Sequence, residues 1–385
     1  MRKINIKISF LFISMIMYLC LTSCIKDTYN MSMFSKKGHL SPTLDISAVK
    51  GDVSFSDVVK SNDTVIFDKD KLVILVFKKD SVVDLKMSDF SKGTVLKTAT
   101  IAPSSYDLNI GNILDHVSGE YRFLNPSIKF NYTNSFPDPL KISLNVTGTG
   151  KGKTVALNLA SFTLSKPTIP GQHEISASYV IDKNNSNLPD VISLPPETVN
   201  YSGSAVITST VKDSQAENYA LSSNHLTGSL EIDVPLDLTL NNLQLIDTID
   251  NFIKDKNNND PLNPESFQLL RINITAKNGF PLGVGMKMSL YNSSTNSLLS
   301  TIDATGLLNP APVDSNGKAD GVGETSTSIE FTKDFLSNVN KADKIIFRFT
   351  LNATGNVTQE IKIYSDYRIN FQAVLVVKPD IKLNL

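Results

Sequence analysis

Residues 126–144 read PSIKFNYTNSFPDPLKISL, and residues 269–290 read LLRINITAKNGFPLGVGMKMSL. In each stretch an alternating apolar run, typical of a β-strand, leads into Asn, a small residue, Phe and Pro, and a second alternating run follows. The Asn of the second stretch follows that of the first by 144 residues (278 − 134). Self-similarity at a fixed offset indicates an internal repeat. The sequence therefore predicts two homologous units built mainly from β-strands.

The corner shared by the two stretches has a physical interpretation. Asn and Gly tolerate positive φ, whereas Pro fixes φ and cannot donate to a strand ladder. We expect the Phe to point inward and to hold the corner on the core. The predicted structural corners are Asn134, Phe136 and Pro137 in the first unit, and Asn278, Phe280 and Pro281 in the second.

The clearest alternation in the chain is LEIDVPLDLTL, residues 230–240, and a similar pattern recurs over 375–385. At about 3.3 Å per residue, this stretch predicts a strand of roughly 36 Å. Pro and acidic residues on its polar face are typical of an edge strand. Its other face is apolar and is a possible surface for an apolar ligand, made of Leu230, Ile232, Val234, Leu236, Leu238 and Leu240.

The rest of the chain completes a mainly β fold. The run KLVILVF, 71–77, is apolar on both faces and predicts a buried strand in a small N-terminal α+β region. Two tandem β-sandwich or half-barrel units follow this region, and we expect a linking helix over 247–254. The predicted limits are 1–23 for a signal peptide, 24–45 for a tether, 46–116 for the N-terminal region, 117–242 for β unit 1, 243–260 for a linker and 261–385 for β unit 2.

The N-terminus has the pattern of a bacterial lipoprotein signal. Basic residues precede an apolar run over 8–21, which is short for a membrane span but typical of a signal segment. The run ends in Leu21-Thr22-Ser23-Cys24, which resembles a lipobox. This resemblance implies cleavage before Cys24, lipidation of that Cys and a membrane anchor of acyl chains such as palmitate. Each buried methylene would contribute ~0.8 kcal/mol to anchoring.

Taken together, the lipobox, the short N-terminal region and the two Asn-x-Phe-Pro corners resemble uncharacterised lipoproteins of Bacteroidota. The resemblance implies an outer-membrane location with a lipid anchor, on either the periplasmic or the surface face. The Lys26-Asp27 pair after the anchor is similar to the surface-export signal of such lipoproteins. The strand–corner–strand unit is also loosely similar to the LEA type 2 β-sandwich, in which an Asn-Pro pair opens a like corner.

Composition excludes several classes of protein. Lys and Arg number 37 against 38 Asp and Glu, so the chain lacks the basic balance that nucleic-acid binding requires. Only 2 Cys and 4 His are present, which excludes a disulfide scaffold and most Cys/His metal sites. No serine-hydrolase, metalloprotease or other catalytic motif occurs. We therefore expect a protein that is not an enzyme and that carries no cofactor.

Two glycine-rich stretches have simple interpretations. TGTGKGKT, 147–154, lacks the first Gly of a phosphate loop and lies between strands, so it predicts a hairpin turn. DSNGKADGVGE, 314–324, offers Asp314, Asn316 and Asp320 as weak calcium ligands. Its Gly and Glu do not fall at the positions that an EF-hand loop requires, so a solvated loop is the preferred interpretation.

Three functions fit these observations. The leading hypothesis is a non-catalytic, envelope-anchored β module that binds or supports an unidentified protein, glycan or lipid. The alternative is a carrier of lipid or another apolar ligand, with strands that enclose a cavity. The third is a surface glycan-binding protein, although the absence of Trp removes the usual stacking residue. An unfilled apolar cavity inside a β unit would favour the carrier, and a fully packed core would exclude it.

Overall fold

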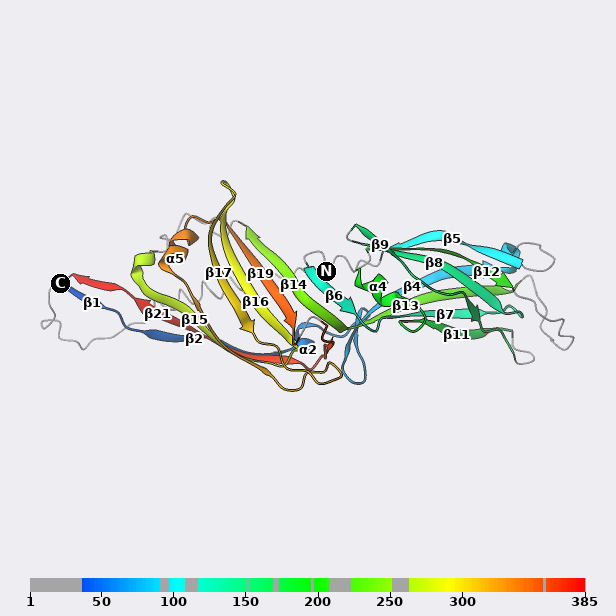
Figure 1. Cartoon of the computed structure of the whole chain (residues 1–385), viewed down its shortest axis with the longest axis horizontal. Helices are drawn as coiled ribbons and strands as arrows, with labels where there is room; N and C mark the ends of the chain where they lie inside the picture. Colours follow the sequence, from blue (N-terminus) through cyan, green and yellow to red (C-terminus); the bar gives the residue numbers. More distant parts are fainter. Residues whose placement is uncertain are drawn as a thin grey trace.

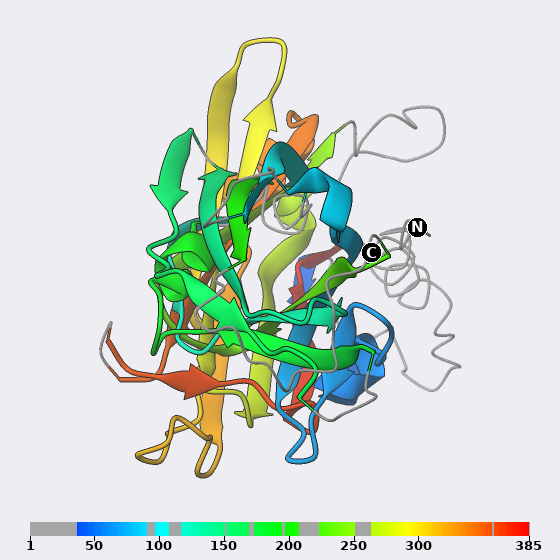
Figure 2. The same ribbon diagram turned by 90° about the vertical axis from the view of Figure 1, so that its right-hand side faces the viewer.

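The computed structural model describes residues 37–90, 97–107, 117–150, 152–168, 173–194, 197–207, 223–250, 263–355 and 358–384. It confirms a mainly β fold. Two β-sandwiches, called unit 1 and unit 2 here, lie end to end along the long axis of the molecule (Figure 1). Viewed from the right-hand end of Figure 1, unit 1 stands in front of unit 2 (Figure 2). All strand pairs in the described ranges are antiparallel, as expected when hairpins and long crossings connect alternating strands.

Unit 1 consists of two facing sheets. The first has the order β10 (Phe162–Leu164), β8 (Leu140–Gly150), β12 (Thr198–Ile207) and β5 (Lys97–Asp107), with β9 (Lys153–Ala156) paired to β8. The second has the order β11 (Ile175–Ile181), β7 (Ser127–Asn134), β13 (His225–Pro235), β4 (Val73–Lys86) and β3 (Val65–Phe67). The short helix α4 (Leu188–Ser193) buries its apolar residues at the end of the sandwich nearer unit 2.

Unit 2 repeats this arrangement. Its first sheet has the order β17 (Ser297–Leu308), β16 (Leu282–Asn292), β19 (Lys344–Ala353), β14 (Asp237–Asp250) and β20 (Ile361–Lys362), with β6 (Val117–Phe123) also on β14. Its second sheet has the order β18 (Gly323–Glu330), β15 (Phe267–Asn278), β21 (Arg368–Pro379) and β2 (Leu44–Ser54). Helix α5 (Lys333–Val339) takes the place of α4. Four strands of each sheet correspond in order, β10-β8-β12-β5 to β17-β16-β19-β14 and β11-β7-β13-β4 to β18-β15-β21-β2. This correspondence supports the duplication that the sequence predicts.

The shorter elements lie at the edges of these sheets. Strands β1 (Lys37–Leu40) and β22 (Ile381–Asn384) pair at the end of unit 2 that lies farthest from unit 1. Helix α2 (Phe55–Val58) follows β2, and it starts with a capping box between Ser54 and Asp57. Two single 3-10 turns, η2 (Met87–Asp89) and η3 (Pro264–Ser266), lead out of β4 and into β15.

The expected N-terminal region 46–116 is distributed over both units. Strand β2 belongs to unit 2, where it pairs with β21, whereas β3, β4 and β5 belong to unit 1. Strand β6, expected at the start of unit 1, pairs with β14 of unit 2. Unit 1 is therefore inserted between β2 and β14 of unit 2, and β6 of unit 2 interrupts it between β5 and β7. Alternation identifies a strand but not its partner, which is why the sequence did not predict this exchange.

The stretch 230–240 is not one edge strand. Strand β13 lies at the centre of its sheet, between β7 and β4, and β14 continues the chain into unit 2 after Leu236. The Leu236 main chain is fixed at this junction, because its N–H donates to Val73 O (2.8 Å) and its carbonyl accepts from Ile363 N (2.9 Å). The expected helix over 247–254 is also wrong as far as Asp250, because β14 continues to that residue.

Candidate functional site

The signal segment, the lipobox and Cys24 lie outside the described residues. The structure therefore starts at Lys37, in β1. None of the helices in the described part of the chain has the length and hydropathy of a membrane span.

The two predicted corners have the same local structure. In each corner the Asn side-chain oxygen accepts from the main-chain N–H of the Phe two residues later, at 3.0 Å. Asn134 and Asn278 are 0% and 1% exposed. No corner residue is among the described residues with positive φ, so the Asn acts through its side chain and not through its backbone conformation. Phe136 is buried against Phe90 in unit 1, and Phe280 packs against Tyr367 near the junction.

The six apolar residues of 230–240 do not form one ligand-binding face. Leu230 and Ile232 line a cavity inside unit 1. Val234 is buried in the core next to α4, and Leu236 and Leu238 also contact the junction core around Ile361 and Ile363. Leu240 is buried in β14, in the sheet of unit 2. The structure thus brings only two of the six residues to one cavity.

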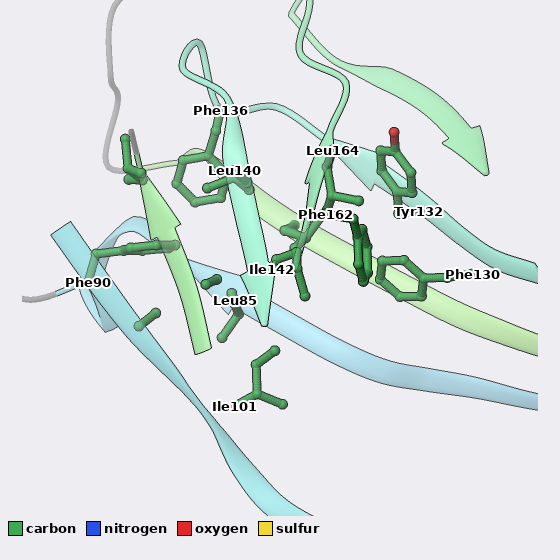
Figure 3. Close-up of a cluster of buried hydrophobic side chains, with 14 of the residues drawn as sticks. Leu85, Phe90, Ile101, Phe130, Tyr132, Phe136, Leu140, Ile142, Phe162 and Leu164 are labelled. Atoms are coloured by element: carbon green, nitrogen blue, oxygen red, sulfur yellow. The ribbon is translucent and has the colours of Figure 1, made fainter. Parts of the chain in front are cut away.

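The cavity lies where the core of unit 1 divides in two. One hydrophobic cluster fills the end around Phe90, Phe136 and Leu140 (Figure 3), and a second cluster fills the end around Leu188 and Val234. The unfilled space between them is about 80 Å³. Its walls are apolar and come from both sheets and from α4; they include Ile101, Leu144, Val146, Val191, Leu230 and Ile232. The core of unit 1 is therefore not fully packed.

Lys79 and Tyr106 are also among the residues that line the cavity. Lys79 Nζ lies 5.2 Å from the centre of the Tyr106 ring, and Tyr106 Oη donates to Lys78 O at 3.3 Å. The two residues stand on β4 and β5, which belong to different sheets, so these contacts join the two sheets of unit 1. Among described residues Lys79 forms no ion pair, whereas its neighbour Lys78 contacts Glu231 (3.2 Å).

A hollow of about 580 Å³ lies on the outer face of the β11-β7-β13-β4 sheet. We call it the polar hollow, because hydroxyl, amide and carboxylate groups project from all four strands. They are arranged in rows across the strands, with Ser178 donating to Asn131 (2.5 Å) and Thr133 beside Ser176 (3.0 Å). The other polar residues of the polar hollow are Asp80, Ser81, Asp84, Thr227 and Ser229.

Unit 2 differs from unit 1 at the position of the polar hollow. Thr133 and Lys277 each directly precede a corner Asn, and they pair with Ser176 and Glu324 on the adjacent strand. The pair in unit 1 is hydroxyl to hydroxyl, whereas Lys277 and Glu324 form an ion pair at 3.2 Å. The two copies of the fold therefore present different chemistry on the same face.

The calcium candidates lie in a loop whose main-chain N–H groups donate hydrogen bonds to its own Asp314 carboxylate. Asp314 Oδ1 accepts from the main-chain N–H groups of Asn316 (2.8 Å) and Lys318 (2.9 Å). These hydrogen bonds, first of all the one from Lys318, lower the pKa of Asp314 below its ordinary value. The Asp320 main chain donates to Pro312 O. Over the described ranges, no group of three His, Cys, Asp or Glu residues has the spacing to hold a metal ion.

Ser135 Oγ lies 3.4 Å from His225 Nδ1. The same hydroxyl makes shorter contacts with the His225 main chain, accepting from its N–H (2.7 Å) and donating to its carbonyl (3.1 Å). The His225 ring also lies 3.2 Å from Ser223 O. This geometry is that of a corner held by main-chain hydrogen bonds, because the hydroxyl is directed at the backbone and not at the ring.

A buried carboxylate lies at the junction of the units. Asp237 is 2% exposed, accepts from Asn125 Nδ2 (2.5 Å) and lies 3.9 Å from Lys362 Nζ. Its Oδ1 has no hydrogen-bond partner among the described residues. Burial raises the pKa of Asp237, and the nearby Glu360 adds to the rise, against the opposing effects of Asn125 and Lys362.

No protein-family model matches the sequence, and no curated protein matches it. Among solved structures, a predicted secreted protein from Parabacteroides distasonis has a TM-score of 0.48 and 16% identity, over 87% of this chain and 99% of that one. A structure of infectious bursal disease virus Gx strain has a TM-score of 0.19 and 7% identity, over 80% of this chain and 42% of the viral chain. The tandem CBM22 domains of Paenibacillus barcinonensis Xyn10C have a TM-score of 0.15 and 10% identity, over 78% of this chain and 97% of theirs. Similarities this weak give no indication of what the chain does.

The sequence offered a partial signal for the polar hollow, which we did not predict. Ser, Thr and Asn alternate with apolar residues in β7, β11 and β13 (SIKFNYTN, ISASYVI and HLTGSLEIDVP). Alternation places these polar residues on one face of each strand. Only the pairing of the three strands, which local sequence does not specify, places the three faces side by side.

Proposed function

We propose that this chain is a non-catalytic lipoprotein of the bacterial outer membrane, anchored through Cys24, whose unit 1 binds a hydroxyl-rich ligand such as a glycan in the polar hollow. The observation that carries the proposal is the polar hollow itself. Its hydroxyls and amides both donate and accept hydrogen bonds, as the hydroxyl groups of a sugar require. The same face of unit 2 carries the Lys277–Glu324 ion pair instead.

The arrangement of the units supports this role. Strand β1 lies at the end of the molecule opposite unit 1 (Figure 1). Twelve residues lie between Cys24 and Lys37, and the 13 residue-to-residue steps (37 − 24) span at most about 45 Å when extended. An anchor at Cys24 would therefore hold unit 2 near the membrane and leave unit 1 farther out. A binding face on unit 1 would then be accessible to ligands in the envelope or outside it.

A glycan array and intact cells of the source bacterium test the proposal. The labelled protein without its signal segment is applied to both, beside the Ser229→Arg variant, which places a long charged side chain in the polar hollow. We expect the wild-type protein to bind a defined set of glycans and the variant to lose this binding by at least tenfold. The loss follows because the arginine occupies the volume that a sugar ring would fill.

Ser326→Arg is the matched control, because Ser326 is an exposed serine on β18 of unit 2. It adds the same side chain to the corresponding sheet outside the polar hollow, and we expect it to leave binding unchanged. Wild-type protein that binds neither cells nor any glycan would contradict the proposal. Equal binding by the Ser229→Arg variant would do the same.

A further inference from the structure

We infer that the glycan bound in the polar hollow carries free amino groups, so that the site selects amino sugars over N-acetylated or acidic sugars. This inference deepens the proposed function and rests on it, because it concerns the same hollow. Two kinds of contact would hold the ligand: sugar hydroxyls on the Ser, Thr and Asn side chains, and ammonium groups on Asp80 and Asp84.

The carboxylates of the polar hollow are not matched by cations. Asp80 and Asp84 both line it and are exposed, and neither has a hydrogen-bond or ion-pair partner among the described residues. The residues described as lining the hollow include no Lys, Arg or His. Lys79 and Lys86, on either side of this stretch of β4, are not part of the lining. The hollow therefore presents negative charge that a cationic ligand would pair.

Carboxylates beside the polar hollow, on the same face of the sheet, are paired. Lys129 contacts Glu231 (3.0 Å) and Asp233 (2.7 Å), and Lys78 contacts Glu231 (3.2 Å). These residues occupy alternate positions that continue the outer face of β4, β7 and β13 beyond the hollow. The sheet thus neutralises these carboxylates with its own lysines and leaves those of the hollow available to a ligand.

A bulge in β4 brings one of the two aspartates to the polar hollow. Asp80, Ser81 and Val82 lie opposite the single residue Ser229 of β13, and Ser81 has a φ of 55°. A positive φ is unfavourable for serine, and such backbone strain is concentrated at functional sites. Bulges redirect side chains beside these sites. The extra residues of this bulge place Asp80 and Ser81 in the lining of the hollow.

Charge determines which sugars these groups would prefer. A carboxylate accepts a charge-assisted hydrogen bond from an ammonium group, which is stronger than a hydrogen bond between neutral groups. An N-acetyl group offers only a neutral amide at the same position of the sugar, and a uronic acid would bring a like charge to the two aspartates. Because both aspartates are exposed, we expect a modest preference, about three- to tenfold for the amine over the amide.

Calorimetric titration with two matched sugars tests the inference: the trisaccharide of chitosan, which has free amines, and its fully N-acetylated form. At mildly acidic pH and low salt, the wild-type protein should bind the free amine about three- to tenfold more tightly. The Asp80→Asn, Asp84→Asn double variant should bind both alike, because it keeps the size of the side chains and removes their charge. Asp63→Asn, at an exposed aspartate outside the hollow, should keep the preference.

The possible outcomes separate this inference from the proposed function. Equal binding of the two trisaccharides, or a preference that survives in the double variant, would overturn the inference, while loss of binding in Ser229→Arg would still support the polar hollow as a glycan site. Wild-type protein that binds only neutral or acidic glycans on the array would overturn the inference in the same way. Binding of no glycan at all would contradict both.

Trilysine tests whether the sugar hydroxyls are needed as well as the charge. It carries amines without the hydroxyls that the Ser, Thr and Asn side chains would contact, so it should bind about tenfold more weakly than the chitosan trisaccharide. Equal binding of trilysine and the trisaccharide would refute the inference, because charge alone would then account for the binding.

Discussion

Asn134 and Asn278 have the same role in the two units. Each side-chain amide donates to a main-chain carbonyl 31 residues further along the chain, Ser165 O for Asn134 (2.8 Å) and Asn309 O for Asn278 (2.9 Å). Each side-chain oxygen accepts from the Phe N–H two residues later. A single buried side chain thus fixes both the corner and a distant loop in each sandwich. This equality of detail supports the duplication more directly than the short sequence motif does.

Alanine at either corner is expected to destabilise its unit. Asn134→Ala leaves the Phe136 N–H and the Ser165 carbonyl without partners, which costs roughly 2–4 kcal/mol. Asn278→Ala should cost more, because its amide also donates to Leu282 O (2.8 Å). Urea unfolding measures both changes. Asn200→Ala, at an exposed asparagine of β12, is the control and should change stability by about 0.5 kcal/mol or less.

Unit 2 is expected to depend on β2 and unit 1 to be independent of it. A protein that begins after Ser54 retains every strand of unit 1 but leaves β21 without its partner along one edge. Hydrogen exchange should therefore show loss of protection in β21 and β15, with β7 and β13 still protected. A synthetic peptide of residues 44–54, added in excess, should restore protection in β21. Equal loss of protection in both units would show that they do not fold separately.

Because Asp237 is buried, we expect the free energy of unfolding to fall as pH rises above the ordinary pKa of an aspartate. Burial raises the pKa of this carboxyl in the folded state from 3.8, so the folded state binds more protons than the unfolded state between 3.8 and the raised value. The contribution of Asp237 is complete below pH 3.8 and is lost as pH passes the folded pKa. Asp237→Asn should remove this dependence, as measured by thermal unfolding between pH 3.5 and 8. Asp366→Asn, at an exposed aspartate, should retain it.

We expect Cys24 to be required for attachment of the protein to the membrane. Cys24→Ser removes the sulfur that would carry the lipid, so the variant should leave the membrane fraction and appear in the soluble fraction of the envelope or the medium. Palmitate labelling of the wild-type protein, and its absence in the variant, checks the chemistry. Protease treatment of intact cells then distinguishes the surface from the periplasmic face. A variant that remains in the outer-membrane fraction would show that another contact holds the protein there.

The strands and the repeat were predictable because their signals are local. Alternation over 127–134 and 267–278 follows from one face being buried, and the Asn-x-Phe-Pro corner recurs in recognisable form. The assignment of strands to units was not predictable, because β2 and β4 both read as strands and only long-range pairing separates them. The same limit applies to Leu236, where an unbroken alternation passes from one sandwich into the other.

The polar hollow and the cavity show the same contrast between local sequence signals and long-range strand pairing. The outward Ser, Thr and Asn residues of the polar hollow can be read from each strand alone, but their adjacency depends on the register between strands. The cavity left no trace in the sequence, because a filled core and an unfilled core have the same alternation.

The insertion of unit 1 within unit 2 sets the order in which the protein can fold during synthesis. Strand β2 emerges early, yet its partner β21 is nearly the last segment to be made; Lys50, for example, pairs with Gln372. Unit 1 has all its strands by residue 235 and can fold before the rest of the chain is made. Unit 2 must wait for the C-terminus, and contacts this distant in sequence form slowly. During that interval β2 presents an unpaired edge, so the incomplete chain is open to pairing with other chains and to aggregation.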